Sequence, residues 1–226
     1  MKNLVEDVWT HEDEIRLGGA PLYLRMTIVR LSNGKLWVHS PTPISDELVR
    51  ETSELGDVAW IVGPNNAHNL FLRDWVSAFP EAELVVSNGI PKKLKLKDGF
   101  TLMGADFDNV WAQDLDRIFM PGVSFFDESV FLHRKSKSLI LTDYIQNHEG
   151  GEKNFVQKFV LGPIGFKGIC IAPPLKMGFM HKDKAGFRES IKRIKQWQFD
   201  RVVVAHGDII EEDAMAIVDR VSERFM

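Results

Sequence analysis

The stretch SLILTDY, residues 138–144, is a short apolar run that ends on a carboxylate. Its leucine and isoleucine side chains fall on both alternating faces, which is typical of a strand covered on both sides. Asp143 follows this strand at its carboxyl end, where α/β sheets usually place their ligands. A buried carboxylate without a partner costs several kcal/mol. The sequence therefore predicts that a cation, a histidine, an arginine or a helix N-terminus lies against Asp143.

The composition is that of an ordinary globular domain. Hydrophobic residues make up 44% and charged residues 27% of the 226 residues, which allows a sizeable core without disulfides. We expect residues 1–226 to form a single domain, with the mostly polar residues 1–20 as an N-terminal arm or a loosely packed first strand. A formal charge of -4 gives no electrostatic reason to expect a nucleic acid or an anionic membrane as partner.

The single cysteine and the N-terminal residues bear on location. Cys170 lies in an apolar run and is expected to be buried, because reactive thiols need an accessible, electropositive setting. One unpaired cysteine also suits a reducing compartment. The N-terminal residues are too charged for a signal peptide, and no apolar run approaches the ~18 residues of a membrane span. The sequence therefore predicts a cytoplasmic protein with no membrane partner.

Strand and helix patterns alternate along most of the chain. The turn SNGK at residues 32–35 predicts a β-hairpin, because Asn-Gly pairs suit tight turns between strands. Strands are predicted at residues 22–30, 36–38, 58–62, 84–86, 117–120, 129–132 and 201–205, with a strand or buried loop at 169–172. Helices are predicted from the cap residue Ser45 to Gly56, from Asn65 or Asn66 to Phe79, and at 154–161, 183–198 and 211–225. Residues 92–116 are assigned to no element.

The order of these elements indicates the fold class. Strands come first, and a strand-helix alternation then follows in two halves. This order favours an α+β protein, namely an αββα four-layer sandwich of two mixed β-sheets flanked by helices.

Several predicted strands end in residues that are able to do chemistry, namely His39, Asn65 with His68, Asp143 and His206. A lone histidine at a strand end is more often a hydrogen-bonded structural residue than a metal ligand. The repeated occurrence of such residues at strand ends favours a metal site, because a β-sandwich places its strand ends along one edge. Neutral imidazoles and a carboxylate that converge there are ligands suited to zinc, iron or manganese.

The polar turn at residues 134–137 permits an inference about register. If this turn pairs His133 with Ser138, then Glu128 falls opposite Asp143. Two carboxylates that close cannot both ionise cheaply, so one is protonated or a cation lies between them. The same register sends His133 to the far end of the hairpin, which indicates a structural role for that histidine.

Several short motifs carry a resemblance to a known family. The stretch LILTD at residues 139–143, followed by VVAHG at 203–207, looks like the fourth and fifth motifs of the metallo-β-lactamase-like superfamily, in which the aspartate binds metal and the late histidine completes the site. The stretch PGV at 121–123 resembles that superfamily's Pro-Gly-His element. The chain is more closely similar to a divergent branch of the superfamily known only as a domain of unknown function. That similarity is carried by residues 26–31, 36–41, 64–65, 68, 128, 131–133 and 139–143.

The chain also departs from the pattern of the superfamily it resembles. The main metal motif there is His-x-His-x-Asp-His, whereas this chain has PNNAHNLF at residues 64–71. His68 is the one histidine that survives, and the motif's aspartate is missing. Val123 stands where the third motif has a histidine, and an apolar side chain cannot ligate a metal. The resemblance therefore implies a degenerate metal site with at most one ion.

Two alternatives for the site remain open. In the first, a single divalent ion (zinc, iron or manganese) is held by His68, Asp143 and His206, and Asn65 lends a further oxygen. Three protein ligands with one open position are typical of catalytic zinc sites. In the second, Asp143 and His206 hydrogen-bond each other or nearby loop amides, and no metal is bound.

These alternatives correspond to two functions. The first is a metal-dependent hydrolase of a small-molecule ester, lactone or amide at a one-metal site. Glu128, which could also lend an oxygen to the ion, or His39 would act as proton acceptor. The second is a catalytically inactive metallo-β-lactamase-like scaffold that serves as a binding or assembly module. A small molecule is the expected ligand, and the oligomeric state is left open.

Overall fold

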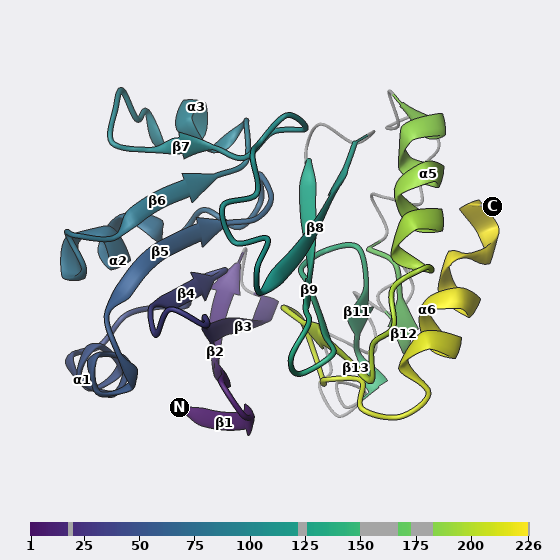
Figure 1. The fold of residues 1–226 in the computed structure, drawn as a ribbon, viewed down its shortest axis with the longest axis horizontal. Helices are drawn as coiled ribbons and strands as arrows, with labels where there is room; N and C mark the ends of the chain where they lie inside the picture. The colour runs from purple at the N-terminus through teal and green to yellow at the C-terminus, as the bar shows by residue number, and fades with distance from the viewer. Residues whose placement is uncertain (18–19, 122–125, 150–166, 173–182, 226) are drawn as a thin grey trace.

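The structure is a computed structural model that describes residues 1–17, 20–121, 126–149, 167–172 and 183–225 (Figure 1). It contains two mixed β-sheets, with helices on the outer side of each sheet. The predicted α+β class and the αββα four-layer sandwich are therefore confirmed. Among the described residues, no helix combines the length and the apolar character that crossing a membrane requires.

The first sheet has seven strands in the order β1-β2-β3-β4-β5-β6-β7. Strands β1 to β4 pair antiparallel, and strands β4 to β7 pair parallel. The parallel strands deliver their carboxyl ends to a single edge of the sheet. The strand bounds are β1 Lys2–Val5, β2 Val8–Leu17, β3 Ala20–Arg30, β4 Leu36–His39, β5 Val58–Gly63, β6 Glu83–Val86 and β7 Thr101–Leu102.

The second sheet has four strands in the order β13-β10-β9-β8. Its strands β10 and β13 are parallel, and its other pairs are antiparallel. A short two-stranded sheet, β11 with β12, lies beside it. The bounds are β8 Leu115–Met120, β9 Glu128–His133, β10 Ser138–Leu141, β11 Gln146–Asn147, β12 Ile169–Cys170 and β13 Arg201–Val204.

Three apolar clusters fill the spaces between the four layers. The central cluster joins the facing sides of both sheets and includes Trp37, Phe131 and Ile140. A second cluster packs the first sheet against α1, α2 and α3, and a third packs the second sheet against α5 and α6 (Figure 1). The helix bounds are α1 Asp46–Leu55, α2 Leu72–Ala78, α3 Ile90–Leu94, α5 Lys184–Ile194 and α6 Ala214–Ser222, followed by the 3-10 turn η4 Glu223–Phe225.

Strand β10 is buried on both faces, as its apolar run predicts. Leu139 and Leu141 contact the helix-side cluster, whereas Ile140 belongs to the cluster between the sheets. The predicted hairpin register is confirmed, because His133 pairs with Ser138. His133 therefore lies at the end of the hairpin away from Asp143, as expected.

Of the two expectations for the N-terminal residues, an arm or a loosely packed first strand, the structure shows strands. Residues 2–17 form β1 and β2, and β2 pairs with β3 over its whole length of ten residues. Five of the ten residues of β2 are charged or histidine, which concealed the strand in the sequence. Such side chains are common on a strand near the edge of a sheet.

The helix expected from Asn65 or Asn66 begins later than predicted. Helix α2 starts at Leu72 and has no side-chain cap. Asn65 does bind backbone N–H groups, at Ala67 and His68, but they belong to a tight turn before the helix. The helix expected at 154–161 lies outside the described residues.

A close backbone contact fixes the loop after β13. Gly207 has a φ of +88°, and a Cβ atom there would lie 1.4 Å from the carbonyl oxygen of Asn147. The N–H of Asn147 donates to the carbonyl oxygen of His206 at 3.0 Å, and the N–H of Asp208 donates to the carbonyl oxygen of Asn147 at 3.1 Å. Strand β11 thus holds the loop that carries His206.

Replacing Gly207 by alanine is expected to lower the free energy of unfolding by at least about 2 kcal/mol, because both the positive φ and the steric clash oppose a side chain. Urea denaturation measures this. Gly99→Ala is the matched control, since Gly99 has a φ of +73° and open space around it. Equal losses in the two variants would contradict the role of the contact with β11.

Candidate metal centre

Three predicted ligands come together at one edge of the sandwich. Strands β10 and β13 are parallel, with Leu141 paired to Val204. Asp143 and His206 each lie two residues beyond that pair, so both reach the same edge of the second sheet. His68 reaches them from the loop after β5 in the first sheet. Ligand atoms of His68, Asp143 and His206 all lie within 4.8 Å of one another.

The three side chains are buried and face one another. The Nε2 atom of His68 lies 3.2 Å from Oδ2 of Asp143, and the Nε2 atom of His206 lies 3.7 Å from Oδ1. The side chains of the three residues are less than a tenth exposed. The predicted partner of the Asp143 carboxylate is therefore a pair of imidazoles.

Each imidazole is held through its other nitrogen. The Nδ1 atom of His68 lies 2.6 Å from the hydroxyl of Ser40, and the Nδ1 atom of His206 lies 2.7 Å from the carbonyl oxygen of Tyr23. A carbonyl oxygen only accepts, so Nδ1 of His206 carries the proton. Neutral His206 therefore has its lone pair on Nε2, on the side of Asp143. Partners of this kind orient histidine ligands in metal sites.

The Asp143 carboxylate also receives two side-chain amides. Asn65 donates through Nδ2 to Oδ2 at 2.7 Å, and Gln146 donates through Nε2 to Oδ1 at 2.8 Å. Burial alone would raise the pKa of Asp143, but His68, His206 and Asn65 together lower this pKa to about 2. The carboxylate is therefore held in its ionised form.

Burial, which raises the pKa of the Asp143 carboxyl, has the opposite effect on the pKa of the His206 imidazole. Burial lowers the pKa of His206. The charge of Asp143 opposes this decrease, and the charge of His68 adds to it. The neutral form of His206 is the form that can ligate a metal.

Asn65 presents its nitrogen to Asp143, so its oxygen is turned elsewhere. The Oδ1 atom accepts the N–H groups of Ala67 at 2.7 Å and His68 at 3.1 Å. The Nδ2 atom also donates to the hydroxyl of Thr142 at 2.7 Å. In this structure Asn65 orients both Asp143 and the turn that carries His68.

Glu128 lies beside Asp143, as the hairpin register predicts. Its carboxylate accepts three successive backbone N–H groups, those of Thr142 at 2.7 Å, Asp143 at 3.0 Å and Tyr144 at 2.8 Å. Burial raises the pKa of Glu128 to about 7, the charge of Asp143 adds to the shift, and the bonds to Thr142 oppose it. Both oxygens of Glu128 are thus occupied by the backbone.

His39, the other expected proton acceptor, lies in the core near the centre. Its ring stacks on Trp37 with 5.0 Å between centroids, and the residue is 1% exposed. Burial holds the pKa of His39 well below its usual value, and the charge of His68 adds to this effect. Among the described residues, the Nε2 atom of His39 has no hydrogen-bond partner.

The sequence analysis did not predict the residues that hydrogen-bond to His68, Asp143 and His206. Ser40, Gln146 and the carbonyl of Tyr23 each bond a predicted ligand. Arg25 donates to the carbonyl oxygens of Val204 at 2.6 Å and of Gly207 at 2.5 Å, and so ties β3 to the end of β13. Polar residues in strands and loops are common, so no local pattern distinguishes these ones.

The donor set fits a single metal ion. A tetrahedral zinc ion places neighbouring ligand atoms about 3.3 Å apart. The Nε2 atom of His68 lies 3.2 Å from Oδ2 of Asp143, that of His206 lies 3.7 Å from Oδ1, and one ligand atom from each residue lies within 4.8 Å of the others. The part of the chain that the structure describes holds one such group of histidine, cysteine and carboxylate residues. Val123, which stands in place of a motif histidine, lies outside the described residues.

Solved metallo-β-lactamases share the fold of the whole chain. TMB-1 is 17% identical with a TM-score of 0.68, over 99% of this chain and 96% of that chain. A metallo-β-lactamase from Pontibacter korlensis is 15% identical with a TM-score of 0.65, over 98% of this chain and 97% of that chain. One from Hirschia baltica is 8% identical with a TM-score of 0.65, over 97% and 95%. At these identities the likeness shows the fold alone.

Sequence comparison identifies the family. No curated protein sequence matches the chain. A family model described as a domain of unknown function, DUF4336, matches residues 5–163, which is more than half of the chain and includes His68 and Asp143. The chain therefore belongs to the DUF4336 family and has the metallo-β-lactamase-like fold.

Proposed function

We propose that this protein is a metal-dependent hydrolase that acts on a small-molecule ester, lactone or amide at a one-metal site. The supporting observation is the orientation of His206. Its Nδ1 proton is committed to the carbonyl of Tyr23, so in the neutral ring Nε2 is an acceptor, and it lies 3.7 Å from the carboxylate of Asp143. Two buried acceptors that face each other are stabilised by a cation between them.

In this proposal the ion is held by Nε2 of His68, Nε2 of His206 and the carboxylate of Asp143. A divalent ion held by these residues would supply Lewis acidity toward a carbonyl oxygen and would lower the pKa of water. Gln146 and Asn65 orient the Asp143 carboxylate through one amide hydrogen bond to each oxygen. The solved neighbours named as metallo-β-lactamases support a metal-dependent scaffold.

The proton acceptor is proposed from the hydrogen-bond geometry. Glu128 has both oxygens bound to backbone N–H groups, which supports a positioning role for the turn that carries Asp143. His39 has a ring nitrogen without a partner among the described residues. Because, in the portion of the chain that the structure describes, His39 has an unoccupied nitrogen and Glu128 has no unoccupied oxygen, His39 is favoured over Glu128 as the proton acceptor.

One observation favours a second function, that of an inactive scaffold. The Nε2 atom of His68 lies 3.2 Å from Oδ2 of Asp143, which is close enough for a direct hydrogen bond if Nε2 carries the proton. The edge would then be held together without a metal, and the protein would serve as a binding or assembly module.

Protein purified without added metal is expected to carry about one divalent ion per chain, because three buried ligands converge. Elemental analysis measures the stoichiometry. His68→Ala and His206→Ala are expected to lose the ion, while His11→Ala should keep it, since His11 bonds Thr42 instead. Absence of metal, together with a melting temperature that added zinc does not change, would support the inactive scaffold.

A panel of small esters, lactones and amides is expected to include at least one substrate, and His68→Ala should reduce hydrolysis to the uncatalysed rate. Gln146→Ala is expected to need about 10–100-fold more metal for half-maximal activity, because residues that orient a metal ligand have effects of this size. The exposed Gln113→Ala is the control and should behave as the wild type. Metal-loaded protein with no activity on any class would count against the hydrolase.

Glu128→Gln is expected to lower the free energy of unfolding by about 1–3 kcal/mol, because a glutamine amide offers one acceptor to three backbone N–H groups. Urea denaturation measures the loss, with the exposed Glu54→Gln on α1 as control. A variant that keeps wild-type stability but loses hydrolysis would instead identify Glu128 as the proton acceptor.

A further inference from the structure

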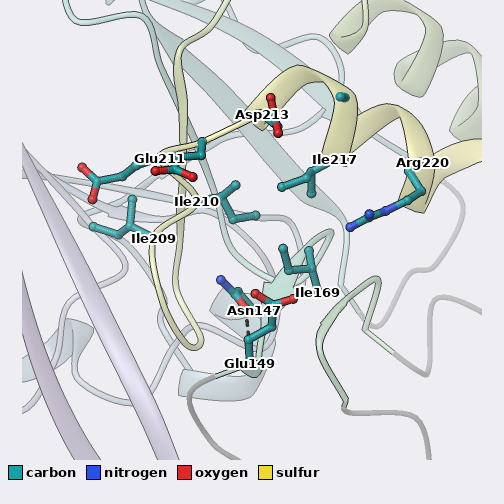
Figure 2. A pocket seen from close by; sticks show the side chains of 11 residues that line it. Asn147, Glu149, Ile169, Ile209, Ile210, Glu211, Asp213, Ile217 and Arg220 are labelled. Atoms are coloured by element: carbon teal, nitrogen blue, oxygen red, sulfur yellow. Dashed lines mark hydrogen bonds between the residues drawn. The ribbon is translucent and has the colours of Figure 1, made fainter.

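A cavity of about 610 Å³ lies between α6 and the short strands β11 and β12 (Figure 2). Its size falls within the range of small-molecule sites. None of His68, Asp143 and His206 lines it, so it is distinct from the candidate metal centre. It adjoins that centre through β11, whose Asn147 contacts the backbone of the loop after His206.

One part of the lining is aliphatic. Figure 2 shows Ile169, Ile210 and Ile217 turned toward the same space. Ile209 and Ala216 complete the apolar surface. Together these side chains can cover an aliphatic group of a bound molecule and remove it from water.

The other part of the lining is charged, and the charges are not paired with one another. The carboxylates are those of Glu149, Glu211, Glu212 and Asp213, and Arg220 reaches toward the cavity from α6. Within the described part of the chain, none of these five groups forms an ion pair. Four carboxylates against one guanidinium favour a cationic ligand.

A buried amide on the cavity wall lacks a hydrogen-bond partner on one side. Asn147 is 5% exposed and lines the cavity. Its Oδ1 atom accepts the N–H of Glu149 at 3.1 Å, which leaves Nδ2 as the free donor. Across the residues that the structure describes, Nδ2 donates to no group. Nδ2 is not among the described polar atoms that are both fully buried and without a partner, so solvent in the cavity reaches it, and a carbonyl oxygen of a ligand can replace that solvent.

We propose that this cavity binds an amphipathic organic cation with a protonated primary amine, an aliphatic body and a carbonyl group. The carboxylates receive the ammonium group, the isoleucine side chains cover the aliphatic body, and Nδ2 of Asn147 donates to the carbonyl oxygen. The proposal is independent of metal binding and of hydrolysis.

Leucinamide is the probe, and isothermal titration calorimetry measures its binding to the full chain. It carries the three required groups. 4-Methylpentanamide is the same molecule without the amine, and glycinamide is the same without the aliphatic side chain. Each analogue is expected to bind at least about tenfold more weakly, because each lacks one of the predicted contacts.

The triple variant Glu211→Gln, Glu212→Gln, Asp213→Asn tests the charges. Asn suits position 213 because Asp213 has a φ of 49°, in a region that asparagine tolerates. Binding of leucinamide is expected to weaken at least about tenfold. The control variant, Glu54→Gln, Glu81→Gln, Asp98→Asn, removes the same charge from exposed positions of the other half of the molecule and should bind as the wild type.

Several outcomes would overturn the proposal. They are no binding of leucinamide to the wild type, equal binding of 4-methylpentanamide, or equal weakening in the triple variant and its control. Circular dichroism of both variants establishes that they are folded. The metal content of the wild type is measured on the same preparation, so a failure here is distinguishable from a failure of the metal centre.

Discussion

The structure depends on a buried, ionised carboxylate, that of Asp143. A carboxylate removed from water must be compensated by nearby donors or cations. Here two imidazoles and two side-chain amides surround it. His68 and Asn65 come from the loop after β5, His206 comes from the loop after β13, and Gln146 lies three residues after Asp143. Satisfying this one charge therefore requires that the loops after β5 and β13 meet the end of β10. The hydrogen bonds that compensate Asp143 therefore also hold the two sheets together at this edge.

The carboxylate of Glu128 holds the backbone at Asp143 in place. Glu128 binds the backbone N–H groups at the end of β10, where the strand has no further ladder partner. It thereby fixes the direction in which Asp143 leaves the strand. The two acidic residues have different roles because their hydrogen-bond partners differ. Asp143 faces side chains that can bind a ligand, whereas both oxygens of Glu128 accept backbone N–H groups.

Much of this edge could be predicted from the sequence. The apolar run before Asp143 and the one before His206 each indicate a buried strand, and parallel strands deliver their ends together. The turn at 134–137 fixed the register that brings Glu128 to Asp143. The roles of Asn65 and Gln146 could not be predicted, since an amide can present either atom and only the folded neighbours decide which. The sequence left open whether residues 1–20 form an arm or a strand, because the polar side chains of β2 suit solvent as well as a sheet.

Arg25 has a consequence for how the protein is made. Its guanidinium binds the carbonyl oxygens of Val204 and Gly207, which lie 179 and 182 residues further along the chain. A growing chain on the ribosome thus contains Asp143 and His68 long before the second imidazole and its anchor can close over them. The edge is incomplete until β13 and the loop that carries His206 have been synthesised. Biosynthesis consequently delays assembly of the three ligands until His206 has been translated.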